Sequence, residues 1–129
     1  LGGQISMMFS TVPVALPLIR SGKLTPLAVT AQKRHFALPD VPTFSEQGYK
    51  SVESETWVGL FAPAGAARNV IDALAQALAR PLRAKSVAEL LRQQGAEPQF
   101  MGPDTFARYV ESEIERWGRV VRAAGIKLE

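Results

Sequence analysis

Apolar residues recur at helical spacing directly after Thr11, over residues 12–19, and this spacing predicts a first amphipathic helix. Thr11 is a residue type that caps helices, and Pro13 falls in the first turn, where its missing N–H costs no hydrogen bond. Gly22 can adopt the left-handed conformation that ends a helix. Pro17 lies inside the same pattern, so we expect it to bend the helix or to shorten its regular part.

The same periodicity predicts two helices in the middle of the chain. The first has its apolar positions between residues 70 and 82, and Pro81 should end or kink it near residues 79–80, because the proline ring clashes with the carbonyl four residues earlier. The second covers residues 87–94 and stops at Gly95. Each of these helices has one apolar face that must be covered by another part of the protein.

The most regular apolar stripe lies near the C-terminus. Residues 102–104, Gly-Pro-Asp, are good residues for the start of a helix, which should continue until Gly125 stops it. Trp117 lies on the apolar stripe, and we expect it in the core. Glu115 and Arg119 are four residues apart on the other face, where they can form an ion pair.

Four short segments carry strand-compatible residues instead: 5–9, 24–30, 58–62 and 97–101. The first two flank the first helix, and a strand, a helix and a strand in close succession normally form a right-handed crossover. We therefore expect these two strands in one parallel sheet. Strands that alternate with helices are typical of the α/β class, so the sequence predicts an α/β fold with parallel-rich sheets flanked by helices.

The segment between the second and third predicted strands is polar. Residues 32–42 contain charged residues and prolines, which are typical of an exposed loop. The Lys-Arg pair at 33–34 can steer an acidic ligand, although a solvated loop is the better interpretation. Thr43 and Glu46 have the spacing of a capping box, so one or two helical turns ending at Gly48 fit here.

Composition excludes several classes of function. The formal net charge is +3, but positive and negative residues are interspersed, and no basic stripe of the kind that binds nucleic acid is present. The chain has no cysteine, which excludes disulfides, thiolate metal sites and cysteine nucleophiles. No apolar run approaches the ~20 residues that cross a bilayer, and the sequence does not open on a basic and then apolar leader.

Catalytic motifs are also missing from the sequence. It has no glycine-rich phosphate loop, no G-x-S-x-G motif and no metal-ligand spacing. His35 is the single histidine and lies in the polar loop, where a solvated side chain is a better interpretation than a general base. The carboxylates of Glu111, Glu113 and Glu115 fit a solvated helix face. We therefore predict no catalytic residue, no metal ligand and no cofactor.

Two places in the sequence do suggest binding. Ser10 and Thr11 follow the predicted strand 5–9 and precede a helix, and hydroxyls with free N–H groups at that point form a natural anion site. Simple helix capping is the alternative for this turn. Trp57, at the start of the third strand, either packs in the core or forms a wall of a ligand cleft.

Four longer segments together resemble one protein family. They are GQISMMFSTVPVALPLIRSGKL, LAVTAQKRHFALPDVPTFSEQGY, ETWVGLFAPAG and the ending from QGAEPQF to AAGIKLE. In order and spacing they are similar to the C-terminal part of the Bug, or TctC-like, extracytoplasmic solute-binding proteins that serve tripartite tricarboxylate transporters. The resemblance covers essentially the whole chain.

The resemblance implies a periplasmic-binding-protein-like fold of type II, a clamp of two α/β lobes, which is incomplete here. It assigns residues 1–54 to part of the second lobe, residues 55–65 to a hinge-crossing strand and residues 66–129 to the C-terminal part of the first lobe. It also implies a periplasmic location, with the signal peptide and the N-terminal half of the receptor outside this sequence.

The implied function is the capture of a small carboxylated solute in the cleft between the lobes and its delivery to a membrane permease, without catalysis. Ser10 and Thr11, the N–H groups of Val12 and Val14, and Trp57 would contact the ligand. The alternative is a truncated half that only self-associates by exchanging strands through exposed sheet edges. A small hydrolase or isomerase ranks below both, because the chain supplies few bases and nucleophiles.

Overall fold

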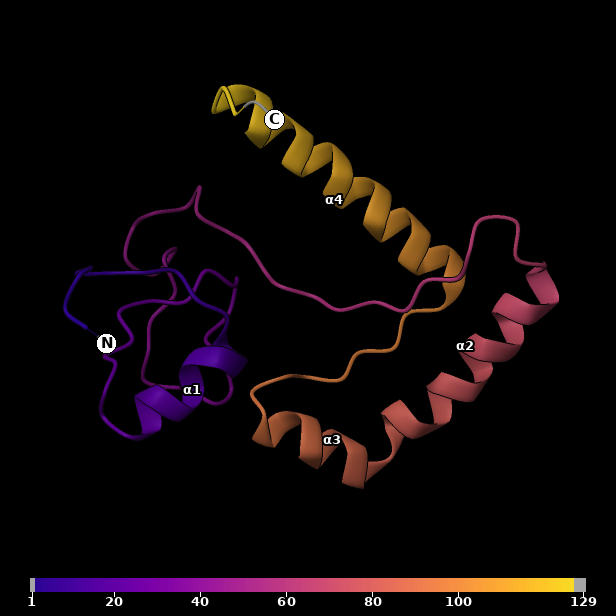
Figure 1. Ribbon diagram of the computed structural model, residues 1–129, viewed down its shortest axis with the longest axis horizontal. Helices are drawn as coiled ribbons and strands as arrows, with labels where there is room; N and C mark the ends of the chain where they lie inside the picture. The colour runs from indigo at the N-terminus through magenta and orange to yellow at the C-terminus, as the bar shows by residue number, and fades with distance from the viewer. Residues whose placement is uncertain (1, 127–129) are drawn as a thin grey trace. The chain divides into compact units, whose positions relative to one another are not determined.

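The computed structural model describes residues 2–126, and the helices in that range are α1, α2, α3 and α4 (Figure 1). Their bounds are Val12–Arg20, Arg68–Arg83, Lys85–Gln93 and Pro103–Ala123. The chain divides into two compact units. One contains the residues up to Phe61 together with Lys85–Pro98, and the other contains Ala62–Ala84 and the residues from Gln99 onward.

The first unit holds the hydrophobic core found among the described residues. Its buried members come from α1 and from the loops that follow it: Leu16, Val29, Leu38 and Val41. Val12, Ile19 and Ala37 pack against this cluster and are partly buried. The core is therefore made by one face of α1 and by a long loop, and the loop supplies most of its side chains.

A single parallel bridge joins the two arms of that loop. The N–H of Val29 donates to the carbonyl of Pro42 at 2.9 Å, and the N–H of Phe44 donates to the carbonyl of Val29 at 3.0 Å. Thr43, which is paired with Val29 across this bridge, is only 2% exposed. The bridge thus holds the predicted strand 24–30 beside the capping box that follows it in the chain.

A second link ties the end of the same segment to residues further along. The hydroxyl of Thr30 donates to the carbonyl of Ser54 at 2.7 Å, and the N–H of Ser54 donates to the carbonyl of Thr30 at 3.0 Å. The side chain of Gln47 donates to the carbonyl of Leu27 at 3.0 Å. These bonds satisfy main-chain groups that a neighbouring strand would otherwise satisfy.

The predicted strands are not formed as a sheet within residues 2–126. Segments 5–9, 58–62 and 97–101 have no ladder of hydrogen bonds, and segment 24–30 has only the bridge at Val29. The expected parallel pairing of 5–9 with 24–30 is therefore wrong for this chain. The physical reason is that a strand needs a neighbouring backbone, and the described residues place Thr43, not segment 5–9, beside Val29.

Helix α1 agrees with its sequence pattern in position but not in the chemistry of its cap. Thr11 occupies the N-cap position, but its side chain makes no capping hydrogen bond. Pro17 lies inside the helix, which continues for three more residues to Arg20. Gly22 has the positive φ of 70° that was expected of the stop.

Helix α2 runs further than predicted. It passes through Pro81 and ends at Arg83, so of the two alternatives given for Pro81, an end of the helix near residues 79–80 is wrong. Because Pro81 lies only two residues before the helix end, its missing N–H removes one hydrogen bond near a terminus, where the cost of a shortened ladder is small. At the other end, Ala67 is the N-cap and makes no side-chain capping bond.

Helices α3 and α4 both end at the predicted glycines. Gly95 follows α3 with a φ of 78°, and Gly125 follows α4 with a φ of 65°. Trp117 on α4 is 42% exposed, so its expected place in the core is wrong. Its indole N–H donates to the carboxylate of Glu113 at 3.2 Å, one turn earlier on the same helix.

The second unit is held by polar contacts between the starts of its two helices. The guanidinium of Arg68, at the start of α2, donates through Nη1 and Nη2 to the carboxylate of Asp104 at 2.8 and 3.1 Å. Through Nε it also donates to Asp72, one turn along α2, at 2.9 Å. One arginine therefore joins the N-terminal ends of α2 and α4.

Candidate functional site

The turn of Ser10 and Thr11 lies at the N-terminus of α1, as the sequence predicts. Thr11 is in extended conformation, with φ −74° and ψ 145°. Its carbonyl accepts hydrogen bonds from the N–H of Ala15 at 3.0 Å and from that of Val14 at 3.2 Å, and Ser10 Oγ lies 3.4 Å from the same carbonyl. Main-chain bonds therefore hold this turn, and they leave its hydroxyl groups nearly unused.

The groups of this turn differ in how available they are to a ligand. Ser10 and Thr11 are exposed, and across residues 2–126 neither the Thr11 hydroxyl nor the Val12 N–H takes part in a hydrogen bond. The N–H of Val14 already points to the carbonyl of Thr11. The positive end of the α1 dipole favours a carboxylate here, and Val12 is better placed than Val14 to donate to it.

An aromatic cluster that the sequence analysis did not single out adjoins the turn. The ring of Phe9, which is 70% exposed, stacks on Phe44 with centroids 6.0 Å apart, and Phe44 meets Tyr49 edge-on at 6.2 Å. Phe9 directly precedes Ser10 in the sequence, and this adjacency was the signal that could have drawn attention to it. Apolar rings thus lie one residue away from the polar turn.

Trp57 lies in the extended segment that follows Ser54. It is partly buried, and its ring lies 6.5 Å from that of Phe61 at an angle of 41°. Phe61, in the predicted strand 58–62, is 64% exposed, and this segment joins no sheet among the described residues. Trp57 therefore has an aromatic neighbour four residues further along the same segment, and its role as a cleft wall stays a prediction.

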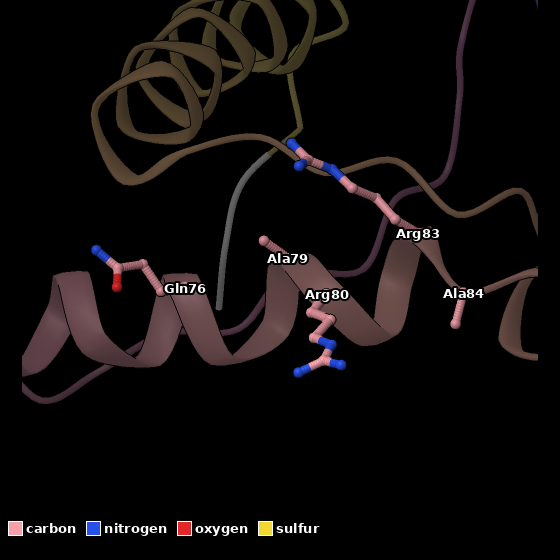
Figure 2. A pocket seen from close by; sticks show the side chains of 5 residues that line it. All are labelled: Gln76, Ala79, Arg80, Arg83 and Ala84. Carbon is pink, nitrogen blue, oxygen red and sulfur yellow. The ribbon is translucent and has the colours of Figure 1, made fainter.

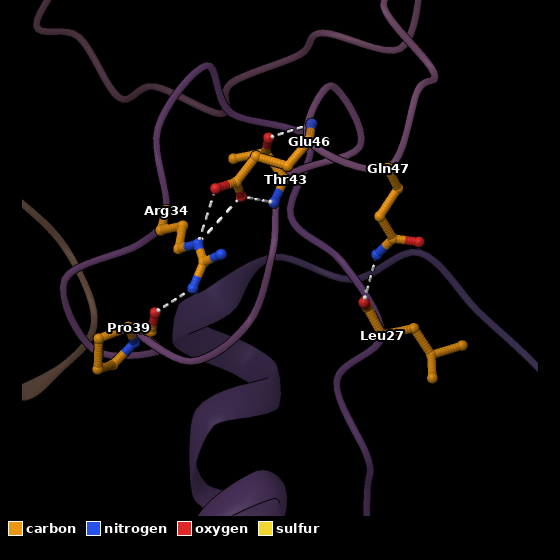
Figure 3. Close-up of polar contacts among 6 residues, drawn as sticks. All are labelled: Leu27, Arg34, Pro39, Thr43, Glu46 and Gln47. Carbon is orange, nitrogen blue, oxygen red and sulfur yellow. Dashed lines mark hydrogen bonds and ion pairs between the residues drawn. The ribbon is translucent and has the colours of Figure 1, made fainter.

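Arg34 is held within its own loop (Figure 3). Its Nε donates to both carboxylate oxygens of Glu46 at 3.0 Å, and its Nη1 donates to the carbonyl of Pro39 at 3.1 Å. The carboxylate of Glu46 also accepts the N–H of Thr43 at 2.7 Å, and the Thr43 hydroxyl accepts the N–H of Glu46 at 3.0 Å. The capping box is confirmed, and Arg34 is committed to it, so steering of a ligand is a poor description of this side chain.

Titration of Glu46 should therefore affect stability. The hydrogen bond from Arg34, followed by that from the Thr43 N–H, holds the pKa of this carboxyl below its usual value near 4.5. A depressed pKa means that the ionised carboxylate stabilises the fold at any pH above its pKa in the unfolded chain. This contribution is lost as pH falls through the lower pKa of the folded state. The pair is exposed, so solvent weakens it.

Replacing Glu46 with Gln should destabilise the protein at pH 7 and much less at pH 3, because wild-type Glu46 loses its charge in acid. Urea denaturation of both proteins at the two pH values measures the difference in unfolding free energy. Glu111→Gln, on an exposed position of α4, is the matched control and should leave the unfolding free energy at pH 7 nearly unchanged. An equal loss at both pH values for Glu46→Gln would contradict the assignment.

His35 is not the fully solvated residue that its loop suggested. It is partly buried, its Nδ1 accepts the N–H of Ala37 at 3.2 Å, and its ring lies 4.4 Å from that of Phe36. A ring nitrogen that accepts a main-chain hydrogen bond orients the loop. The structure thus gives His35 a local structural role.

A shallow depression of about 540 Å³ lies along α2, in the second unit. It is lined by Gln76, Ala79, Arg80, Arg83 and Ala84. Figure 2 shows the side chains of Arg80 and Arg83 leaving the helix in different directions. The guanidinium of Arg83 lies 5.6 Å from the ring of Phe100. Because its two cations do not converge, this depression lacks the polar geometry of an anion site.

Residues 2–126 contain neither a metal-binding cluster nor a helix that could span a membrane. No group of three or more histidine, cysteine, aspartate or glutamate side chains in that range could hold a metal ion. Within the same range, no helix combines the length and the apolar character needed to cross a membrane.

Sequence comparison places the chain among receptors. The TctC family model, described as "Tripartite tricarboxylate transporter family receptor", matches residues 1–126. Protein BugT of Bordetella pertussis is 36% identical over 129 residues, which are all of this chain and 40% of that protein. A UPF0065 protein in the tcbD-tcbE intergenic region of Pseudomonas sp. is 34% identical over 92% of this chain and 36% of its own length.

Comparison with solved structures agrees with the sequence. "Structure of a periplasmic transporter" has a TM-score of 0.88 and 34% identity, covering 99% of this chain and 43% of that one. The periplasmic binding protein BugD has a TM-score of 0.79 and 33% identity, covering 89% of this chain and 39% of that one. "R. palustris Rpa4515 with adipate" has a TM-score of 0.79 and 37% identity, covering 88% of this chain and 38% of that one. The expected periplasmic-binding-protein-like fold class is confirmed as a partial fold, because the chain spans less than half of each.

Proposed function

Because the chain belongs to the TctC family of tripartite tricarboxylate transporter receptors, we propose that it forms the C-terminal part of a periplasmic receptor for a small carboxylated solute. The observation that carries this proposal is the family match over residues 1–126, together with similarity to periplasmic binding proteins along nearly the whole chain. The family is described as a receptor, which agrees with the expectation of a binding protein without catalysis.

The proposed receptor is a clamp, and this chain supplies parts of both lobes. Residues 1–54 would belong to the second lobe, 55–65 would cross the hinge and 66–129 would return to the first lobe, apart from Lys85–Pro98, which form one compact unit with the residues up to Phe61. The extended segments 5–9 and 58–62 would then pair with strands from the part of the receptor that the relatives have beyond the matched region. Exposed apolar side chains support this: Val58 is 97% exposed, and Ile5 is 69% exposed.

The solute would bind through one carboxylate to the turn before α1. The hydroxyls of Ser10 and Thr11 and the N–H of Val12 offer donors at the positive end of a helix, so no arginine is required. The N–H of Val14, in the same turn, would also contact the ligand, and the side chain of Trp57 would line the cleft. The other wall, and with it the choice among solutes, would come from the remainder of the receptor.

Dicarboxylates are a reasonable first class of ligand to test, since one similar structure is described as holding adipate. The loaded, closed receptor would deliver its solute to the membrane permease of the transporter. A location outside the cytoplasmic membrane follows from that role, and similarity to periplasmic binding proteins supports it.

Isothermal titration of the protein at the length that its gene encodes tests the proposal, with a panel of dicarboxylates, tricarboxylates, amino acids and aromatic acids. For a solute that binds, Thr11→Val should weaken affinity about tenfold, because one hydrogen bond to a charged group is lost. Thr105→Val, at an exposed position of α4, is the matched control and should leave affinity unchanged. Absence of binding across the whole panel would refute the solute-capture function.

A second candidate function is self-association of this half alone. Its support is the set of exposed apolar residues on extended segments: Ile5, Met7, Phe9, Val58, Leu60 and Phe61, each at least 64% exposed. Unpaired strands of this kind can pair with another copy of the chain. Light scattering after gel filtration of the 129-residue chain decides: a dimer supports strand exchange, and a clean monomer argues against it.

A further inference from the structure

Gly95 is a buried glycine that lies against the first turn of α1. It follows α3 and has a φ of 78°, in the region that side chains rarely adopt. A Cβ added to it would lie 3.3 Å from Leu16 Cδ2, 3.4 Å from Val12 Cγ1 and 3.5 Å from the Cα of Pro13. The close approach of the chain to α1 at this point therefore depends on the absence of a side chain.

The α1 side of this contact has little freedom to move away. Leu16 is 2% exposed and belongs to the core cluster with Val29, Leu38 and Val41, and Val12 packs against the same cluster. Since interiors of this kind are closely packed, an added methyl group cannot be absorbed by Leu16 alone. The displacement would pass to Val12, which lies in the first turn of the helix.

The α3 side is held equally firmly. The N–H of Gly95 donates to the carbonyl of Arg92 at 2.9 Å, and the N–H of Ala96 donates to that of Leu91 at 3.0 Å, which is the glycine-ended helix stop. The guanidinium of Arg92 also pairs with Glu97 at 3.0 Å. Because these bonds fix the chain at Gly95 and the core fixes Leu16, the contact would be relieved by movement of Val12 and of the first turn of α1.

We propose that Gly95 is a positioning residue, which sets the first turn of α1 and thereby the donors of Thr11 and Val12. The proposal rests on the proposed function for its consequence on ligand binding, but the placement of the turn can be measured without a ligand. Gly95 reaches the turn from a segment far along the chain, so it positions the turn through packing and need not touch the solute.

Gly95→Ala tests this proposal, with Gly125→Ala as a matched control. Both glycines follow a helix, with φ values of 78° and 65°, and both precede a residue whose N–H bonds back to the helix. An added Cβ at Gly125 meets no atom within 4 Å. The two substitutions therefore share the backbone penalty, and only Gly95→Ala adds the contact with α1.

The first readout needs no ligand. Amide hydrogen exchange of Ala15, whose N–H donates to the carbonyl of Thr11, reports the first turn of α1. We expect faster exchange in Gly95→Ala than in the wild type and no change in Gly125→Ala. Equal exchange rates in the two variants would overturn the proposal, whether or not the protein binds any carboxylate.

The second readout is affinity for whichever carboxylate of the panel binds. Gly95→Ala should weaken it about tenfold, the loss of one well-aligned hydrogen bond, and Gly125→Ala should not. The double variant Val12→Ala/Gly95→Ala removes one of the two methyl groups that the new Cβ meets, Val12 Cγ1, and should recover part of the exchange protection and of the affinity. If the double variant recovers neither, steric positioning by Gly95 is wrong.

Discussion

Leu16→Ala should destabilise the first unit by about 2–5 kcal/mol, the largest loss expected from a single substitution in this chain. Leu16 is 2% exposed and is one of four buried apolar residues in its core cluster, so the other three cannot fill the volume that it leaves. The cavity would also lie beneath Gly95 and the first turn of α1.

Urea denaturation followed by Trp57 fluorescence measures this loss in the first unit. Trp117→Phe provides the background, because Trp57 and Trp117 are the two tryptophans and lie in different units. Leu90→Ala is the matched control, since Leu90 is also helical and is 60% exposed. A loss below about 1 kcal/mol for Leu16→Ala would contradict the core assigned here.

Thr43→Val should cost about 1–2 kcal/mol, the second largest expected effect, even though valine has nearly the same shape. The Thr43 hydroxyl accepts the N–H of Glu46 at 3.0 Å, and the residue is 2% exposed. Valine leaves that N–H without its acceptor. The change also loosens one half of the capping box that holds Arg34 in place.

The same denaturation experiment measures the effect of Thr43→Val. Thr105→Val, which makes the same chemical change at an exposed position, should alter stability by less than about 0.5 kcal/mol. If Thr43→Val and Thr105→Val were equally stable, the hydrogen bonds of the capping box would not contribute to stability, and the prediction would be wrong. Hydrogen exchange at the Glu46 amide should also be faster in Thr43→Val.

Local patterns were the part of the fold that could be predicted well. The capping box of Thr43 and Glu46 and the helix stops at Gly95 and Gly125 depend on residues within one or two turns of each other. Their chemistry is complete within a few residues of sequence. The predicted cap at Thr11 shows the limit, because the residue type was right for the position but its hydroxyl is not used.

Pairing and burial could not be predicted in the same way. Segment 5–9 has the composition of a strand, but strand pairing is decided by a neighbour that may come from anywhere in a chain. Trp117 lies on an apolar stripe and is still 42% exposed. An apolar stripe indicates which face of a helix can be buried, but it does not indicate which segment packs against that face. The family resemblance supplied the fold class that periodicity alone could not complete.

By itself, the sequence determined the family, the places of α1 to α4 among the described residues, the glycine stops of α1, α3 and α4, and a polar turn of Ser10 and Thr11 placed before a helix. Only the tertiary structure decided that Val29 pairs with Thr43, that Arg34 is bound to Glu46, and that Gly95 lies against α1. The first set depends on chemistry between near neighbours in the chain. The second depends on contacts between distant residues, whose partners are selected only when the core around Leu16 is packed.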